Sequence, residues 1–256
     1  MKKRYFWIYV LPVLMVTTII GFGVLGINSA VYEQKMQEEL AKIEWKMEPI
    51  ETYESKKPYY ESYADVIEVV CYDKSNQWVG KRFFSSSSIE LNWEEADQRL
   101  RLNDEQNREN QDWFYFDSSL PGFEKYDGEL LASSFFSEGL ALLYFEDHLV
   151  CVDREYNIVF EKKAHIESSY VKSGTSEENV MKKGINTEGF HEGLAVFTLD
   201  GCRYGILDRE GNVLIEPVFK GKDTFTVMKN QNIAFFYGGE FRIGEIAVRT
   251  GGEIGE

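Results

Sequence analysis

Two stretches of the sequence decide the fold: FSEGLALLYFEDHLVCVDREYNIVFE, Phe136–Glu161, and FHEGLAVFTLDGCRYGILDREGNVLIEPVF, Phe190–Phe219. The pattern F-x-E-G-L-A occurs at 136–141 and at 190–195, and D-R-E-x-N occurs at 153–157 and at 208–212. The first pair lies 54 residues apart and the second 55, so the copies differ by one residue in an intervening turn. Two motifs that recur in the same order and almost the same register indicate an internal repeat.

Each copy has the pattern of three strands joined by two turns. In the second copy, LAVFTL and RYGILD flank the hairpin signal Asp200-Gly201, and NVLIEPVF follows a second tight turn. We expect Gly193 and Gly211 at turns with positive φ, which glycine adopts without a steric penalty. A three-stranded meander cannot bury its apolar face alone, so stacked copies supply the core. Three pairs of equivalent positions are expected to be buried: Phe136 and Phe190, Leu140 and Leu194, and Cys151 and Ile206.

Weaker copies flank these two. CYDKSNQWVG (71–80) follows the spacing of ILDREGNVLI (206–215), and IAVRTGGEI (246–254) follows its first residues. The sequence therefore predicts an all-β fold of repeated antiparallel three-stranded meanders, preceded by an N-terminal transmembrane helix and a short helical stalk. Residues 59–129 are expected to form a degenerate β-repeat with a polar insertion, and residues 130–256 the main β-repeat region.

The motif order F-x-E-G-L-A, [K/R]-[W/Y]-G-[Y/I]-[I/L]-D and G-N-x-[V/L]-I-x-P resembles the bacterial WG-repeat (WG beta repeat) family. In the best copy, Arg203-Tyr204-Gly205 stands where the family usually has Lys-Trp-Gly, whereas Leu149-Val150 replaces the eponymous dipeptide in the first copy. The resemblance covers roughly Leu130–Glu256, and begins at Tyr59 if the weak first copy is included. It implies all-β arrays, often on exported or surface-anchored proteins, and defines no catalytic residues.

An apolar segment near the N-terminus, Phe6–Ile27, predicts a membrane-spanning helix. Its 22 residues rise about 33 Å as an α-helix, enough to cross a hydrocarbon core of ~30 Å. Basic residues occupy positions 2–4, and the next charged residue is Glu33. By the positive-inside rule, residues 1–5 are cytoplasmic, residues 6–27 are a single-pass signal-anchor in the cell membrane, and the C-terminal domain is extracellular.

A cleaved signal peptide, cut after Ala30, is the alternative. Signal peptides usually have an apolar region of only about 7–15 residues, and Asn28 fits the cleavage site poorly. A lipid anchor is disfavoured because the first cysteine is Cys71. Both remaining interpretations export residues 31–256.

The segment after the span, residues 28–58, is predicted to be a helical stalk and linker. Val31–Met47 contains neither glycine nor proline, and Pro49 ends the helical pattern. Farther along, Ala64–Asp73 and the run QWVGKRFF are expected to be strands. Within the polar insertion we expect a short helix over Trp93–Leu102.

The cysteines and acidic residues give no site. Cys71 and Cys151 are interpreted as buried structural residues, with a disulfide between them as an alternative outside the cell. Cys202 is expected to be the most exposed thiol. Asp153 and Asp208 are expected to cap turns rather than to bind calcium.

The histidines give no site either. His148, His165 and His191 are far apart in the sequence and lack the clustered spacing of a zinc site. We therefore assign no catalytic, cofactor-binding or metal residue, expect no cofactor, and predict that the protein is not an enzyme.

The net charge and the aromatic residues indicate which kinds of partner the chain can bind. A formal charge of -15 argues against nucleic acid, because phosphates bind basic surfaces. Tyr144, Phe197 and Tyr204 are expected to be exposed aromatic contacts on the strands. The predicted function is a membrane-anchored, exported β-repeat module that binds a protein, a peptide or a cell-envelope polymer.

Two other functions stay open. One is an accessory subunit of a membrane complex, in which small residues four apart in the span, Thr17 and Gly21, permit close helix packing. The other is an exported hydrolase whose site carries no recognisable motif.

Overall fold

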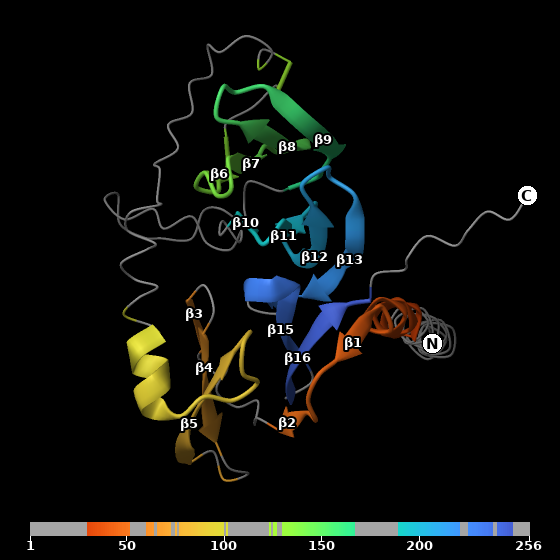
Figure 1. The fold of residues 1–256 in the computed structure, drawn as a ribbon. Helices are drawn as coiled ribbons and strands as arrows, with labels where there is room; N and C mark the ends of the chain where they lie inside the picture. The colour runs from red at the N-terminus through yellow and green to blue at the C-terminus, as the bar shows by residue number, and fades with distance from the viewer. Residues whose placement is uncertain are drawn as a thin grey trace, which may run out of the picture. The chain divides into compact units, whose positions relative to one another are not determined.

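A computed structural model describes residues 30–51, 60–63, 66–72, 75, 77–99, 101, 123, 125–126, 130–166, 189–220, 225–237 and 240–247 (Figure 1). The chain divides into two compact units, Met1–Ala41 and Lys42–Glu256. In the first unit, residues 30–40 form an α-helix. The predicted span, Phe6–Ile27, lies outside the described residues, and among those residues no helix has the length and apolar character needed to cross a membrane.

The second unit is built from antiparallel β-sheets, which confirms the predicted all-β class. The helical pieces among its described residues are a helix over residues 93–99 and a 3₁₀ turn at Lys229–Gln231. The strands form four sheets, each named below by its strands.

The β6–β9 sheet contains the first sequence copy (green in Figure 1). Its strands follow chain order and are β6 (Ala132–Ser133), β7 (Leu140–Tyr144), β8 (His148–Asp153) and β9 (Ile158–Lys163). Strands β7 to β9 form the predicted meander, and the two-residue β6 adds an edge. In β7 against β8, Leu140 lies opposite Asp153 and Leu142 opposite Cys151.

The β10–β13 sheet contains the second copy and has the same strand order. Its strands are β10 (Phe190–His191), β11 (Leu194–Thr198), β12 (Arg203–Asp208) and β13 (Val213–Lys220). Leu194 lies opposite Asp208 and Val196 opposite Ile206, which is the register of β7 and β8 carried into the second copy. The six positions expected to be buried are all less than 8% exposed: Phe136, Phe190, Leu140, Leu194, Cys151 and Ile206.

The last sheet of the chain takes strands from both ends of the second unit. Its strands are β14 (Phe225–Val227), β15 (Asn232–Tyr237), β16 (Glu240–Ile246), β1 (Ile43–Trp45) and β2 (Ile50–Glu51). Strands β1 and β2 both pair with β16, in the order β1-β16-β15-β14. The prediction of a helix through Met47 is therefore wrong for residues 43–47. The helix ends at residue 40, because the following segment gains its hydrogen bonds from β16.

The β3–β5 sheet lies in the region expected to hold a degenerate copy. Its strands are β3 (Tyr60–Tyr63), β4 (Val66–Tyr72) and β5 (Trp78–Ser85). Both predicted strands are confirmed, and the helix predicted over Trp93–Leu102 is present at residues 93–99. Asn92 caps that helix, its Oδ1 accepting a hydrogen bond from Glu95 N at 2.8 Å.

The sheets pack face to face. Phe219 and Phe235 join the β10–β13 and β14–β16 sheets with ring centroids 5.1 Å apart, and Phe84 and Phe241 join the β3–β5 and β14–β16 sheets at 5.0 Å. The β6–β9 and β10–β13 sheets share one buried cluster. Both faces of β7 and of β11 are covered, which explains why every residue of these strands is buried instead of every second one. For β7, the second face packs against Phe123 and Tyr126.

Candidate interaction surface

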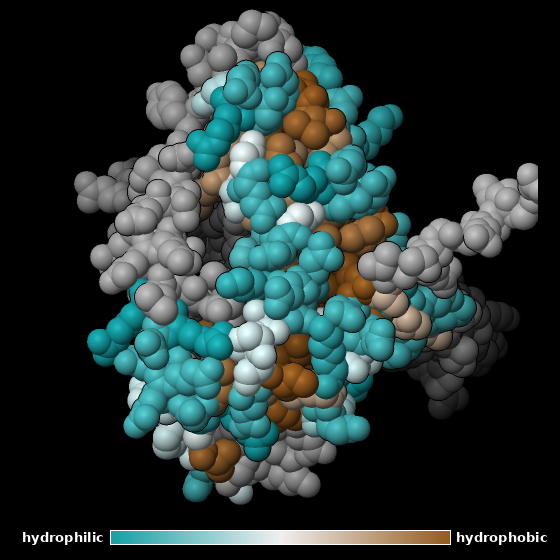
Figure 2. Space-filling view, in the orientation of Figure 1, coloured by the Kyte–Doolittle hydropathy of each residue, from teal (hydrophilic) through white to brown (hydrophobic). Residues whose placement is uncertain are grey.

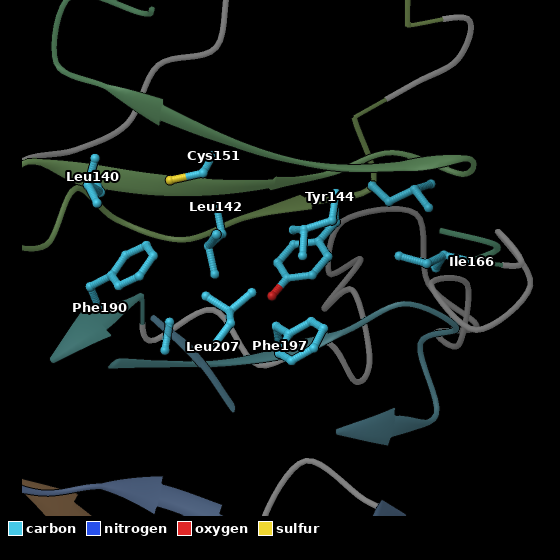
Figure 3. Close-up of a cluster of buried hydrophobic side chains, with 11 residues drawn as sticks. Leu140, Leu142, Tyr144, Cys151, Ile166, Phe190, Phe197 and Leu207 are labelled. Carbon is cyan, nitrogen blue, oxygen red and sulfur yellow. The ribbon is translucent and has the colours of Figure 1, made fainter. Parts of the chain in front are cut away.

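The aromatic residues expected to be exposed lie in the core, and that expectation is wrong. Tyr144 and Phe197 are 0% exposed and Tyr204 is 1% exposed. Figure 3 shows the Tyr144 ring pointing between the two sheets toward Phe197 and Leu207. One face of each strand was expected to meet solvent, whereas both faces of β7 are covered. The β10–β13 sheet packs on one face, and Phe123 and Tyr126 pack on the other. These side chains stabilise the stack and are unavailable to a partner.

Two tight turns repeat the same hydrogen bonds. Asp153 Oδ1 accepts bonds from Glu155 N at 3.0 Å and Asn157 N at 2.8 Å, and its Oδ2 accepts from Asn157 Nδ2 at 2.9 Å. Asp208 makes the equivalent set with residues 210 and 212 at 3.0, 2.7 and 2.8 Å. The Asn157 side chain is the main cause that lowers the pKa of Asp153. Both aspartates therefore cap turns, as the sequence predicts.

A second pair of turns joins neighbouring sheets. Glu138 and Gly139 both have positive φ, and so do Glu192 and Gly193 in the second copy. Glu138 Oε2 accepts a hydrogen bond from Gly193 N at 2.9 Å, and its carbonyl accepts one from Arg209 Nη2 at 3.0 Å. The carboxylate and guanidinium of this contact hold the turns of two sheets together.

The structure describes the side chains of two cysteines, Cys151 and Cys202. Cys151 is fully buried, and burial raises the pKa of its thiol to about 12, so the nucleophilic thiolate is suppressed near neutral pH. Cys202 lies half-buried in the turn between β11 and β12. Both are free thiols. Cys71 belongs to β4, but its side chain lies outside the described residues.

One titratable cluster forms near β9. Glu161 Oε2 accepts bonds from Tyr126 Oη at 2.8 Å and Lys125 Nζ at 2.6 Å, while the Tyr126 ring lies edge-on to His148 at 5.4 Å. Burial, and then the Glu161 carboxylate, raise the pKa of Tyr126 to about 12. The Lys125 ammonium lowers the pKa of Glu161, and Glu161 raises the pKa of Lys125. These three groups keep fixed protonation states near neutral pH, which suits a structural contact better than proton transfer.

His165 and His191 lie apart from this cluster. His165 N donates to Leu199 O at 2.7 Å, and His191 lies in the short strand β10. Across the described part of the chain, no three His, Cys, Asp or Glu side chains gather in a way that could hold a metal ion.

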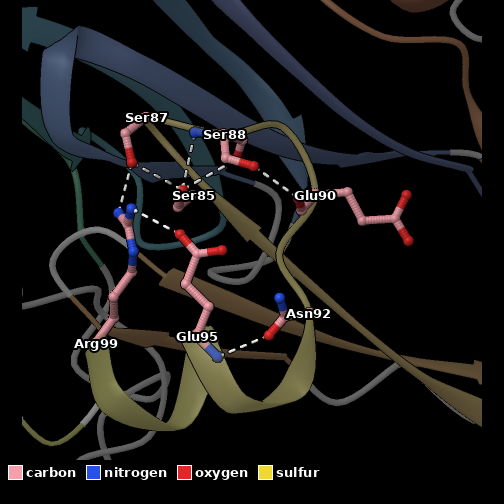
Figure 4. Close-up of polar contacts among 7 residues, drawn as sticks. All are labelled: Ser85, Ser87, Ser88, Glu90, Asn92, Glu95 and Arg99. Atoms are coloured by element: carbon pink, nitrogen blue, oxygen red, sulfur yellow. Dashed lines mark hydrogen bonds and ion pairs between the residues drawn. The ribbon is translucent and has the colours of Figure 1, made fainter.

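A serine turn connects β5 to the helix over residues 93–99 (Figure 4). Ser85 Oγ accepts a bond from Ser88 N at 3.0 Å and donates one to Ser88 O at 3.0 Å. Arg99 donates from Nη1 to Ser87 Oγ at 2.5 Å and from Nη2 to Glu95 Oε1 at 3.1 Å. The guanidinium is thus bound within the turn and helix, and it positions the helix over the sheet.

Exposed apolar side chains concentrate in one segment. On the face drawn in Figure 2, hydrophilic residues predominate among the coloured atoms, and hydrophobic ones lie in separate patches. Among described residues, seven large hydrophobic side chains are exposed, and four of them fall within residues 78–93: Trp78 at 61%, Val79 at 60%, Ile89 at 42% and Trp93 at 58%. We call residues 78–93 the apolar segment. No sequence signal marked it, because strand and helix patterns do not reveal which residues a neighbouring sheet leaves uncovered.

No protein-family model, curated protein or solved structure matches this chain. The resemblance to WG repeats therefore depends on the motif residues of the sequence.

Proposed function

We propose that this chain is a membrane-anchored, exported interaction module in which stacked WG-like β-repeats form a scaffold and the apolar segment contacts the partner. The observation that carries the proposal is the division of the apolar side chains. The central strands β7, β8, β11 and β12 bury their apolar side chains, whereas four of the seven large apolar side chains exposed among the described residues lie at residues 78–93. Contiguous exposed apolar surface commonly marks an interaction site, and these four side chains are the candidates for such a surface.

The repeat assignment is supported by how equivalent side chains face. Ala195, Phe197 and Leu207 of the β10–β13 sheet face back toward the β6–β9 sheet and share its core cluster. Their equivalents in the first copy, Ala141, Leu143 and Val152, belong to the cluster on the opposite face of the β6–β9 sheet. The same face of each copy thus points the same way along the stack, as in a head-to-tail array of repeats.

The membrane anchor is supported by sequence. The segment Phe6–Ile27 is apolar throughout, and Lys2, Lys3 and Arg4 precede it. Export of the β-sheets then follows from the positive-inside rule, and the partner is a protein, a peptide or a cell-envelope polymer.

Site-specific photocrosslinking of the full chain in membranes tests the binding function. A benzophenone amino acid at Ile89, in the apolar segment, should crosslink to a discrete partner. The same group at Val159, equally exposed at 45% but on β9, is the matched control and should not. Equal yields from both positions would contradict the surface assignment.

A turnover assay separates binding from hydrolysis. Full-length protein assayed against peptidoglycan, glycan and ester substrates should show none. Turnover that one point substitution abolishes would contradict the binding function. A membrane protein recovered with the Ile89 crosslink would favour the accessory-subunit role.

A further inference from the structure

We propose that the first part of the apolar segment, Trp78–Arg82 at the start of β5, is a projecting arm that contacts an anionic lipid surface. This inference deepens the proposed function and depends on the proposed membrane anchoring. The remainder of the apolar segment, including Ile89 and Trp93, is left for the macromolecular partner.

The burial of β5 changes abruptly along the strand. Its last three residues, Phe83, Phe84 and Ser85, are buried, while its first five are exposed or half-buried. Lys81 and Arg82 are consecutive and so point to opposite faces of the sheet, and both are exposed. The exposed side chains of β5 therefore lie on both faces of the strand. These five residues span about 17 Å of strand, and the packed part of the sheet begins at Val69, the partner of Arg82 in β4.

The backbone of the arm is distorted at its apolar end. Cys71 pairs with Gly80 and Tyr72 with Trp78, which leaves Val79 as an extra residue in β5. Gly80 has a φ of +151° at this β-bulge. Bulges redirect side chains and interrupt strand pairing. The two largest exposed apolar side chains of the arm thus lie at a bulge near the hairpin end and not in a regular ladder.

The order of residues along the arm matches a membrane interface. Trp78 and Val79 come first, and the basic residues Lys81 and Arg82 follow them toward the sheet. Tryptophan favours the headgroup region, and basic side chains favour an anionic surface. Lys81 forms an ion pair with Glu68 of β4, which partly neutralises its charge. Arg82 lies opposite Val69 of β4 in the strand register.

Basic side chains outnumber acidic ones in this part of the chain. The whole chain has a formal charge of -15, yet residues 73–82 contain Lys74, Lys81 and Arg82 and the single acid Asp73. The arm is thus locally basic, with Lys81 paired to Glu68. One tryptophan and a few basic groups bind lipid only weakly when free, but an anchor in the same chain makes the contact intramolecular.

Quenching by brominated lipids tests the arm. Full-length protein carrying Trp7→Phe, which removes the tryptophan of the predicted span, is reconstituted into phosphatidylcholine vesicles with and without phosphatidylglycerol. Trp78→Phe should remove most of the lipid-dependent quenching. Trp93→Phe is the matched control, because Trp93 is equally exposed but precedes Glu94 and Glu95, and it should leave the quenching intact. Arg82→Glu should lower the quenching only in vesicles with phosphatidylglycerol.

Flotation of the same vesicles separates the two proposals. Protein that floats while Trp78→Phe leaves the quenching unchanged would overturn the arm and leave the anchor in place, and would assign Trp78 to a protein contact instead. Protein that does not float would overturn the anchor and this inference together.

Discussion

The close approach of β13 explains why the second copy has glycine at position 205, whereas the first copy has a larger residue at the equivalent position. Between the pairs Tyr204–Phe219 and Ile206–Ile215, β13 has three intervening residues where β12 has one, so β13 bulges toward Gly205. A Cβ on Gly205 would lie 2.2 Å from Ile215 O and 2.7 Å from Pro217 N. The equivalent Val150 pairs with Glu161 in a regular stretch of ladder, where a side chain fits.

Gly205→Ala should therefore destabilise the protein by about 3 kcal/mol, because backbone atoms of β13 must move to admit the methyl group. Gly193→Ala is the control. Gly193 has a φ of +80°, but its nearest neighbour is 3.9 Å from a built Cβ, so about 1 kcal/mol is expected. Urea denaturation of the detergent-solubilised chain measures both. Equal losses would show that β13 does not approach Gly205 so closely.

Tyr144 carries a buried hydroxyl without a hydrogen-bond partner. Burial raises the pKa of this phenol, which stays neutral at all accessible pH values. Tyr144→Phe should stabilise the protein by about 1 kcal/mol, because an unsatisfied polar group is removed without opening a cavity. Tyr126→Phe is the opposite case. Its hydroxyl donates to Glu161 at 2.8 Å, so this variant should lose about 1 kcal/mol. Thermal unfolding compares the stability of the two variants with that of the parent chain. A less stable Tyr144→Phe variant would show that the Tyr144 hydroxyl makes a hydrogen bond.

Asp200 should give a pH-dependent stability. Burial alone would raise the pKa of its carboxyl, but hydrogen bonds from Arg203 N at 2.7 Å and Cys202 N at 2.9 Å outweigh burial and lower it. The stabilisation is therefore fully present above the unfolded pKa of about 3.9 and is lost as pH falls through the lower folded value. Asp200→Asn should lower the free energy of unfolding by about 1 kcal/mol at neutral pH. The difference in stability between this variant and the parent chain should disappear in acid. Asp97→Asn, which removes an exposed helix ion pair, is the control and should cost less stability at neutral pH than Asp200→Asn. A stability difference between Asp200→Asn and the parent chain that grows in acid would contradict a lowered pKa of Asp200.

At the scale of elements, β1 completes the last sheet of the chain. The order β14-β15-β16-β1 matches β10-β11-β12-β13, with the fourth strand supplied from the other end of the unit. Gly244 is also crowded against β1, since its Cβ would lie 2.6 Å from Ile43 Cγ2 and 2.7 Å from Glu44 O. The strand β1 therefore completes the sheet formed by β14, β15 and β16.

Lys46→Pro should open this closure. Lys46 N donates to Ile243 O at 2.9 Å, and proline removes that donor at the end of β1. Lys46→Ala is the matched control, because it loses only the side-chain bonds to Asn232 and Glu245. The proline variant should lose at least about 1 kcal/mol more than the alanine variant. Hydrogen exchange should then speed up at Ala247, whose amide donates to Lys42 O. Unchanged protection there would contradict the role of β1.

The strands that the sequence predicts correctly are those specified by local pattern and turn residues. Leu194–Thr198 and Arg203–Asp208 lie on either side of Asp200-Gly201, and that turn sets their register. The pairing of Ile43 with Ile246 joins residues far apart in the sequence. The local composition around Ile43 therefore predicts a helix, although the segment forms a strand. Exposure of Tyr144 was mispredicted for a related reason. Only the stacking of sheets decides whether a strand has a solvent face.

At the scale of the whole molecule, the chain combines an apolar N-terminal segment, a scaffold of stacked sheets and one segment of exposed apolar side chains. The central strands of the scaffold are occupied by packing, and among the described residues most of the large exposed apolar side chains lie within Trp78–Trp93. A binding role is consistent with the fixed protonation states around Glu161 and the suppressed thiolate of Cys151. The orientation of this scaffold with respect to a membrane is the claim on which the proposed function depends.

Cysteine accessibility in intact cells tests that claim most directly. Full-length chains carrying Glu210→Cys, in the exposed turn after β12, or Lys3→Cys, before the predicted span, are treated with a membrane-impermeant maleimide. The parent chain gives the background from its own cysteines. Glu210→Cys should be labelled in intact cells and stay with the membranes after a carbonate wash, whereas Lys3→Cys should be labelled only after lysis. Labelling of Glu210→Cys only after lysis, or release of the chain by carbonate, would contradict a membrane-anchored, exported module.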